Sequence, residues 1–161
     1  MTKGQFIELV EKEQGPLRRF LCALCGGDRT VADDIAQEAL MKAYLSYTRF
    51  EGRAKFSTWL FRIACNCYYD WRKTALPAAS DVRREGFSDE EADGNFRHQG
   101  LYMAIDSLSE NEKAAVLLYY MEGRPVKEIA EITGMPSVTV RSHLFRARKH
   151  LKAFLESERM K

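Results

Sequence analysis

The residues whose types best suit chemistry lie near the C-terminus, in residues 136–161. This stretch carries seven Lys or Arg side chains and only two acids. Its apolar residues recur at helical spacing, at Val140, Leu144, Ala147 and Leu151. The side chains left on the opposite face are Arg141, Ser142, Phe145, Arg146 and Lys149. Guanidinium and hydroxyl groups bind base edges and ammonium groups bind phosphates, so this face suits duplex nucleic acid.

A helix-turn-helix over residues 126–155 is the element expected to position these side chains. Val126, Ile129, Ala130 and Ile132 give its first helix an apolar face. Gly134-Met135-Pro136 ends that helix, because glycine accepts a left-handed cap and proline cannot continue a helix. Ser137 is a suitable N-cap for the second helix, which in such motifs lies in the major groove. The alternative is an ordinary helical hairpin with a solvated basic side.

A second basic block covers residues 53–73, with five Lys or Arg side chains against one acid. The segment 49–56, here called the downstream loop, interrupts the helical pattern and combines cations with two aromatic rings. The helix predicted after it, capped by Ser57-Thr58 and ending near 73, places Arg62, Asn66, Tyr69 and Lys73 on one stripe. Aromatic rings stack on unpaired bases for about 1–3 kcal/mol each, and cations hold phosphates. The block therefore suits single-stranded nucleic acid, the alternative being a core helix with mixed exposed residues.

The helix predicted from Thr30, with Asp33 as capping partner, to about Tyr47 has a third polar face. We call this face the acidic patch, and it consists of Asp34, Gln37, Glu38 and Met41. Such a face is either solvated or binds a protein partner with a basic helical surface.

Cysteine chemistry is the main competing interpretation. Cys22-x-x-Cys25 with Cys65-x-Cys67 would be the zinc or redox set. Both pairs lie within helical patterns without flanking turn residues, so small core thiols are the favoured explanation. No Ser/His/Asp or paired-carboxylate arrangement stands out. We expect no catalytic residue, no bound metal and no cofactor.

The chain is expected to be all-α, with two small helical domains joined by a flexible linker. Residues 1–73 form the first domain, with one helix ended by Gly15-Pro16 and a second closed by Gly26-Gly27. Residues 74–98 form the acidic linker, with six acids against three arginines, and residues 99–161 form the second domain. In the latter, Ser109 and Glu112 predict a capping box, and Pro125 suits a first helical position. No apolar run could span a membrane, and acids near the N-terminus exclude a signal peptide, so the expected location is cytoplasmic.

Four segments together resemble one known family. They are DDIAQEAL at 33–40, FSTWLFRIACN at 56–66, EGRPVKEIAEITGMP at 122–136 and TVRSHLFRARKHL at 139–151. In this order and spacing they are similar to bacterial RNA polymerase sigma factors of the extracytoplasmic-function (ECF) group of the sigma-70 family. That group keeps only the family's second and fourth conserved regions, and the resemblance covers nearly the whole chain except the linker.

The resemblance implies a role for each polar face. The acidic patch would dock on the clamp helices of the polymerase largest subunit, and residues 117–121 would meet the flap of the second-largest subunit. The −10 element would be melted and read as single strand by Arg49, Arg53, Lys55, Phe56, Asn66 and Arg72. The −35 element would be read as duplex by Ser137, Thr139, Arg141, Ser142, Phe145, Arg146 and Lys149.

The partners implied are core RNA polymerase, promoter DNA and an anti-sigma factor, with no membrane insertion and no enzymatic activity. His143 stands where the family more often has arginine, which predicts one fewer phosphate contact or a contact that depends on pH. The alternative function is a helix-turn-helix regulator that acts without docking on polymerase. A cysteine-based zinc or redox protein is the less favoured alternative.

Overall fold

The computed structural model describes residues 1–79 and 103–159, which form helices joined by loops, with no strand among them. The N-terminal half consists of α1 (Lys3–Leu24), α2 (Arg29–Ser46), the 3-10 turn η1 (Tyr47–Arg49) and α3 (Phe56–Ala79). The C-terminal half consists of α5 (Glu110–Val116), the π-helical turn η2 (Leu117–Met121), α6 (Val126–Thr133) and α7 (Ser137–Arg159). The all-α prediction is confirmed. The predicted acidic linker falls almost entirely outside the described residues.

The N-terminal half is built on apolar stripes at helical spacing. Its fully buried side chains include Leu17, Phe20 and Leu21 from α1, Ile35, Ala36 and Ala39 from α2, and Leu60, Phe61 and Ala64 from α3. The alanines of α2 let its backbone come close to its neighbours. Burying each of the larger side chains contributes roughly 1.5–3 kcal/mol, so this core fixes the positions of the polar faces on α2 and α3.

Helix α1 differs from the sequence prediction, because it is one helix rather than two. Pro16 lies inside it and costs it one backbone hydrogen bond. Leu17 and Phe20, directly after the proline, are completely buried, so packing against α2 and α3 outweighs the local break. The helix begins with a capping box in which Thr2 and Gln5 exchange hydrogen bonds of 2.9 and 3.2 Å.

The starts of α2 and α3 also differ from prediction. The N-cap of α2 is Asp28, whose carboxylate accepts from the Val31 N–H at 3.1 Å, and Thr30 is already helical. Helix α3 begins at Phe56, before the predicted cap at Ser57-Thr58. Phe56 is buried, and the Thr58 hydroxyl inside the helix is buried without a hydrogen-bond partner in the described part of the chain, so it does not act as the predicted cap.

The helix-turn-helix forms over the predicted residues, but both of its helix starts differ by one position. Pro125 is the N-cap of α6 rather than its first residue, and Ser137 is the first residue of α7 rather than its N-cap. Gly134 adopts a left-handed conformation with φ of 80° and its N–H donates to the Ala130 carbonyl, which closes α6. Helix α7 starts with Ser137 as its first helical residue, and the Val140 N–H donates to the Pro136 carbonyl at 3.0 Å. Its predicted inward residues Val140, Leu144 and Ala147 are buried, which turns the polar face of α7 outward.

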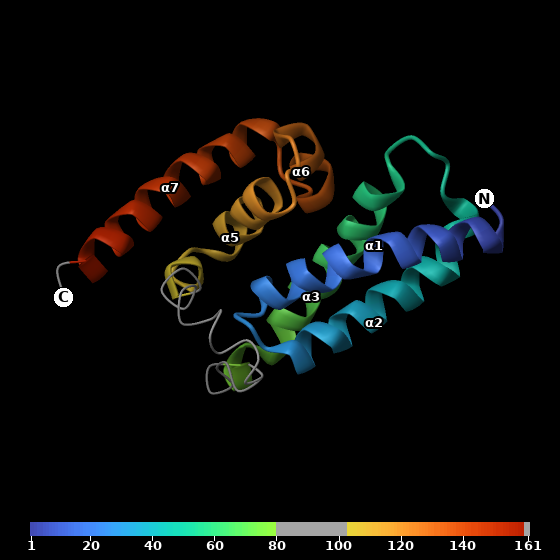
Figure 1. The fold of residues 1–161 in the computed structure, drawn as a ribbon, viewed down its shortest axis with the longest axis horizontal. Helices are drawn as coiled ribbons and strands as arrows, with labels where there is room; N and C mark the ends of the chain where they lie inside the picture. Colours follow the sequence, from blue (N-terminus) through green and yellow to red (C-terminus); the bar gives the residue numbers. More distant parts are fainter. Residues whose placement is uncertain (80–102, 160–161) are drawn as a thin grey trace.

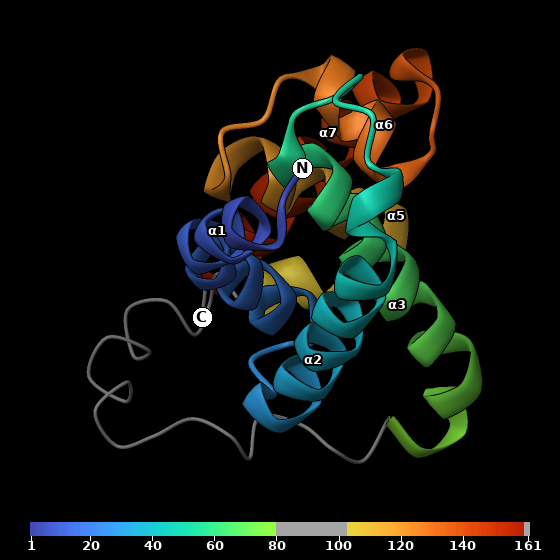
Figure 2. The same cartoon turned by 90° about the vertical axis from the view of Figure 1, so that its right-hand side faces the viewer.

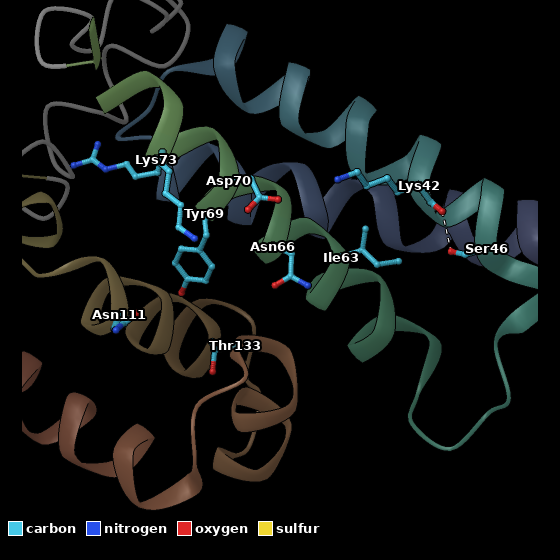
Figure 3. A pocket seen from close by; sticks show the side chains of 10 residues that line it. Lys42, Ser46, Ile63, Asn66, Tyr69, Asp70, Lys73, Asn111 and Thr133 are labelled. Atoms are coloured by element: carbon cyan, nitrogen blue, oxygen red, sulfur yellow. Dashed lines mark hydrogen bonds between the residues drawn. The ribbon is translucent and has the colours of Figure 1, made fainter. Parts of the chain in front are cut away.

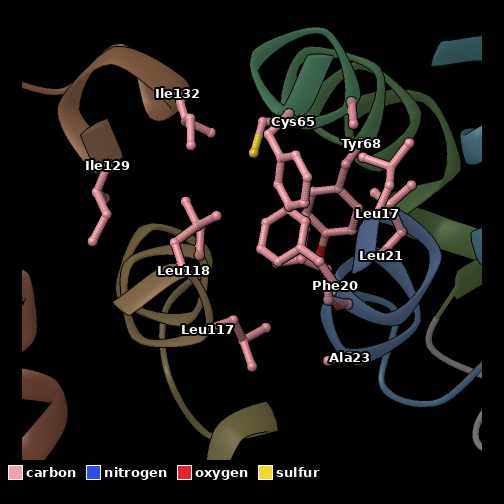
Figure 4. Packing of buried hydrophobic residues seen from close by; sticks show 14 of the residues in the cluster. Leu17, Phe20, Leu21, Ala23, Cys65, Tyr68, Leu117, Leu118, Ile129 and Ile132 are labelled. Atoms are coloured by element: carbon pink, nitrogen blue, oxygen red, sulfur yellow. Dashed lines mark hydrogen bonds between the residues drawn. The ribbon is translucent and has the colours of Figure 1, made fainter. Parts of the chain in front are cut away.

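The two halves pack against each other. Figures 1 and 2 show α5, α6 and α7 together along one side of α1, α2 and α3. One continuous apolar core runs through both halves. Leu118 of η2 and Ile132 of α6 point toward Cys65 of α3, and Leu117 lies near Ala23 of α1 (Figure 4). The polar faces predicted from the sequence are therefore carried by one closed body.

Candidate nucleic-acid and protein interfaces

The outward face of α7, which we call the reading face, consists of Arg141, Ser142, Phe145, Arg146 and Lys149. All five side chains are exposed. The Lys149 ammonium lies 4.7 Å from the centroid of the Phe145 ring, which is 57% exposed. The structure thus presents an aromatic ring beside cations on the helix that a helix-turn-helix places in the major groove. Ser137 and Thr139, at the N-terminal end of the same helix, are half-buried.

Histidine and arginine side chains next to the reading face have partners within the chain. Arg146 Nη2 lies 3.3 Å from His143 Nδ1. Burial, with Arg146 adding to it, lowers the pKa of His143, which favours the neutral imidazole in the free chain. Arg148 donates to the Tyr120 hydroxyl and lies over the rings of Tyr119 and Tyr120, which directs it away from a phosphate.

The downstream loop projects from an aromatic cluster. Phe56 is buried among Phe6, Phe50 and Trp59, with ring centroids 5.6–6.0 Å from its own. The neighbouring rings cover Phe56, so it supports the loop and cannot stack on a base as predicted. Arg49 is exposed, and Arg53 is also exposed while forming an ion pair of 3.0 Å with Glu51.

A groove beside α3 contains two of the predicted single-strand contacts, Asn66 and Arg72, whereas Arg49, Arg53, Lys55 and Phe56 lie outside it. Its volume is about 780 Å³, and Figure 3 shows side chains from α2 and α3 on one side and from α5 and α6 on the other. Its lining residues are Lys42, Ser46, Ile63, Asn66, Tyr69, Asp70, Arg72, Lys73, Asn111 and Thr133. This volume is in the range of roughly 300–1,000 Å³ typical of small-ligand sites, so it is large enough for an unpaired base.

Tyr69 is a groove residue whose hydroxyl has an unmet hydrogen-bonding need. Its hydroxyl is buried and finds no hydrogen-bond partner in the described part of the chain. Burial raises the pKa of Tyr69, so the hydroxyl stays protonated as a donor. Asn66, one turn earlier on α3, is exposed and offers an amide. Tyr69 and Asn66 together bring part of an aromatic ring and an amide to the groove, while the Tyr69 hydroxyl itself is buried.

The acidic patch lies on the solvent-exposed side of α2. Asp34, Gln37, Glu38 and Met41 are exposed, and Met41 keeps 62% of its surface accessible. Glu38 forms an ion pair of 3.3 Å with Lys42 one turn later, with both side chains about half exposed. Such an exposed pair contributes little to stability, so the patch is available to a partner.

Contacts between the halves involve one of the predicted DNA-binding cations. Lys55 Nζ lies 2.8 Å from a Glu128 carboxylate oxygen of α6. Arg124 Nη1 donates to Ser57 Oγ at 2.8 Å, and its guanidinium lies 4.8 Å from the Phe61 ring centroid. Hydrogen bonds, first from Lys55 and then from Arg124, hold the pKa of Glu128 below its ordinary value of 4.5.

A second set of contacts joins α1 and α3 of the N-terminal half to α5 of the C-terminal half. Arg72 of α3 forms an ion pair of 3.3 Å with Glu110 of α5, and the Tyr68 hydroxyl contacts the same carboxylate. Lys113 Nζ donates to the Leu24 carbonyl at 3.3 Å. Burial, with Glu110 adding to it, raises the pKa of Tyr68, so this phenol remains a donor. Arg72 is therefore partly committed to a carboxylate of the other half.

Sequence reasoning missed the acids and arginines that join the halves. They are Arg19, Glu110, Glu122, Arg124 and Glu128. None of them lies on an apolar stripe or in a charge run, so helical periodicity contains no signal for them. The acid Glu128, in the first helix of a predicted DNA-binding motif, is the one of these residues whose sequence context could have indicated an internal partner.

The cysteine alternative finds no support in the structure. The four thiols are free, Cys65 and Cys67 are buried in α3, and burial raises the pKa of Cys25 and of Cys65 to about 12. Within residues 1–79 and 103–159, no group of three or more His, Cys, Asp or Glu side chains is arranged to hold a metal ion. No helix in the same residues is long and apolar enough to cross a membrane.

Comparison with known families assigns both halves. The description "Sigma-70 region 2" matches residues 9–75, and "Sigma-70, region 4" matches residues 98–151. The ECF RNA polymerase sigma-E factor of Escherichia coli K12 is 33% identical over 132 residues, which span 72% of this chain and 69% of that protein. The sigma-E factor of Haemophilus influenzae is 31% identical over 135 residues, 74% of this chain and 71% of that protein.

Solved structures agree with this assignment. One is the sigma factor RpoE from Bartonella quintana, solved in complex with the anti-sigma factor NepR. It aligns with a TM-score of 0.76 and 25% sequence identity, and the alignment covers 94% of this chain and 97% of that one. CnrH, in complex with the cytosolic domain of CnrY, aligns with a TM-score of 0.76 and 21% identity over 97% of this chain and 90% of that one, which shows a shared fold. The chain belongs to the sigma-70 family, in its ECF group of RNA polymerase sigma factors, which direct the polymerase to specific promoters.

Proposed function

We propose that this sigma factor divides promoter recognition among three surfaces. The acidic patch on α2 docks on the clamp helices of the polymerase largest subunit. The downstream loop and the groove beside α3 hold the −10 element as single strand, and the reading face of α7 binds the −35 element as duplex. The observation that carries the proposal is that the acidic patch and the reading face are both exposed and lie on different helices.

Strand opening follows from the chemistry of the α3 groove. This mechanism uses no bound nucleotide, so the free energy must come from capturing bases that have left the stack. Stacking of a base on an aromatic ring contributes about 1–3 kcal/mol, and the Tyr69 ring lines the groove beside the exposed Asn66 amide, which can bind a base edge. Arg49 and Arg53 of the loop would hold the phosphates of the captured strand.

The reading face supplies sequence discrimination upstream. Arg141 and Arg146 have the planar donor geometry that pairs with guanine, while Lys149 binds as a point charge to phosphate. The contact with the −35 element is completed by Ser142, Phe145 and two polar residues in the first turn of α7, Ser137 and Thr139.

Charge reversal of the acidic patch tests the polymerase contact. The double variant Asp34→Lys/Glu38→Lys is expected to abolish binding to core polymerase, measured by native gel shift or by anisotropy of labelled protein. The matched control is Glu8→Lys/Glu11→Lys, which makes the same change in net charge at exposed positions of α1. Unchanged binding by the patch variant would contradict the proposal and favour a regulator that binds DNA without docking on polymerase.

Further partners and location follow from the family. Because the similar RpoE and CnrH structures contain NepR and the cytosolic domain of CnrY, we include an anti-sigma factor among the partners of this chain. The polymerase and its promoters are cytoplasmic in bacteria, so we place the factor there. The chain acts as a specificity subunit and carries no catalytic residue of its own.

A further inference from the structure

We infer that Val138 is a specificity-determining residue of α7, and that it recognises the 5-methyl group of one thymine in the −35 duplex. The inference deepens the proposed function and rests on it, because it requires the reading face to lie in the major groove. An apolar side chain neither donates nor accepts hydrogen bonds, so Val138 would add a preference that the arginines of the reading face cannot supply.

Val138 is an apolar side chain held in solvent. Its exposed fraction is 70%, more than the 57% of Phe145, whereas Val140 two positions later is completely buried. Ser137 and Thr139, on either side of Val138, are half-buried. Of the first three residues of α7, Val138 is therefore the one most accessible to a ligand in front of the helix.

The rotation of α7 directs Val138 to the same side as the reading face. Val138 precedes Arg141 by three positions and Phe145 by seven, which are spacings of one helical face. At about 100° per residue, Val138 lies within about 20° of the mean direction of the reading face, while Ser137 and Thr139 lie about 100° to either side of Val138. Helical side chains lean toward the N-terminus, so Val138 extends the reading face by one turn at that end. This is the end at which the second helix of a helix-turn-helix contacts base edges.

The stability of α7 gives no reason for a valine at this position. β-branched residues form helices less well than alanine, and an exposed valine gains little from burial. Acidic side chains in the first turn would stabilise the helix through its dipole, yet the first turn of α7 contains none. A ligand that carries both negative charge and an apolar group explains both choices, and duplex DNA is such a ligand.

Thymine is the base that an exposed valine can distinguish in the major groove. Its 5-methyl group is the apolar group on that edge of the base pairs, and the other three bases present hydrogen-bonding groups there. Valine pairs with none of those groups, so against another base it would remove their water without replacing it. Burial of one methyl group corresponds to about a fourfold change in affinity.

The position of this thymine follows from the rise of the helix. Val138 precedes Arg141 by about 4.5 Å along the axis, which is little more than one base-pair step of about 3.4 Å. The thymine should therefore lie within about two base pairs of the pair contacted by Arg141. Phe145 lies about 10 Å further along α7 than Val138, so any thymine that it contacts is a different one.

Replacing thymine by uracil removes only the methyl group and tests the contact directly. The full chain is bound to fluorescent duplexes that the wild type selects from a random pool, with each thymine replaced in turn by deoxyuridine. In the wild type we expect a loss of about fourfold at one thymine, within about two base pairs of the position at which Arg141→Ala relaxes the preference. Val138→Ala should bind the unmodified duplex at least about fourfold more weakly and should not distinguish thymine from uracil at that position.

A matched control removes an apolar side chain from another side of the same helix. Leu155 is 43% exposed and lies about 110° from the mean direction of the reading face. Leu155→Ala should therefore keep the wild-type ratio of thymine to uracil affinity. Alanine forms helices better than valine, so far-ultraviolet circular dichroism of Val138→Ala should show undiminished helix content.

Two kinds of failure are distinguishable. Equal effects of uracil on the wild type and Val138→Ala at every thymine, or a selected element without thymine, would overturn the inference. If Arg141→Ala still relaxes the preference at one position in that case, the reading face stands and only the role of Val138 fails. A wild type that prefers no duplex over another would contradict the proposed function of the reading face and the inference with it.

Discussion

The pair Arg141→Ala and Lys149→Ala separates base recognition from phosphate binding on the reading face. The two residues lie eight positions apart on α7, about 12 Å along its axis, on the same exposed side. Arg141→Ala removes a guanidinium suited to bidentate pairing with guanine, a contact that discriminates by about 1–3 kcal/mol, or roughly 5- to 150-fold in affinity. Lys149→Ala removes one phosphate contact and should lower the slope of log affinity against log salt by about 0.9.

Fluorescence anisotropy on duplexes selected from a random pool measures both effects. Arg141→Ala should lose its preference at one position of the selected element while its affinity for other sequences changes little. Lys149→Ala should weaken all duplexes by the same factor, and the loss should shrink as salt rises. Equal, uniform losses in both variants would show that the reading face is wrongly assigned.

Further predictions concern glycine conformation and pH. Gly134→Ala should lower the melting temperature by several degrees, because a φ of 80° costs a non-glycine residue about 1 kcal/mol. Gly15→Ala should raise the melting temperature, because Gly15 lies inside α1 and nothing lies within 4 Å of an added Cβ. A change of the melting temperature in the same direction in both variants would contradict the backbone argument. The lowered pKa of Glu128 means that its contacts with Lys55 and Arg124 contribute fully to folding stability above its ordinary pKa of 4.5 and that this contribution is lost as pH falls further. The melting temperature should therefore fall at acidic pH in the wild type, and Glu128→Gln should make that fall smaller.

The secondary structure of the second half was predictable because its signals are local. Gly134 and Pro136 end one helix and begin another through backbone preferences that hold in any context. The inward residues of α7 recur at helical spacing and are buried. The same rules were wrong for α1, where a proline that usually ends a helix lies inside a buried one. Tertiary packing keeps α1 continuous through Pro16, and a short stretch of sequence carries no information about that packing.

The contacts between halves were not predictable from one sequence. Lys55 and Glu128 are 73 positions apart and carry ordinary surface residue types, so nothing local indicates that they meet. Phe56 shows the same limit, because an aromatic residue in a basic loop is equally suited to stacking on a base or to anchoring the loop. The structure buries Phe56 beside Phe6, whereas Tyr69, which lines the groove, is only half-buried.

Run-off transcription with core polymerase on a pool of genomic promoters tests the central claim most directly. The account predicts transcripts that start downstream of a shared pair of elements, that require the added protein, and that disappear with Asp34→Lys/Glu38→Lys while persisting with Glu8→Lys/Glu11→Lys. Transcripts no more frequent or specific than those of core polymerase alone would contradict it.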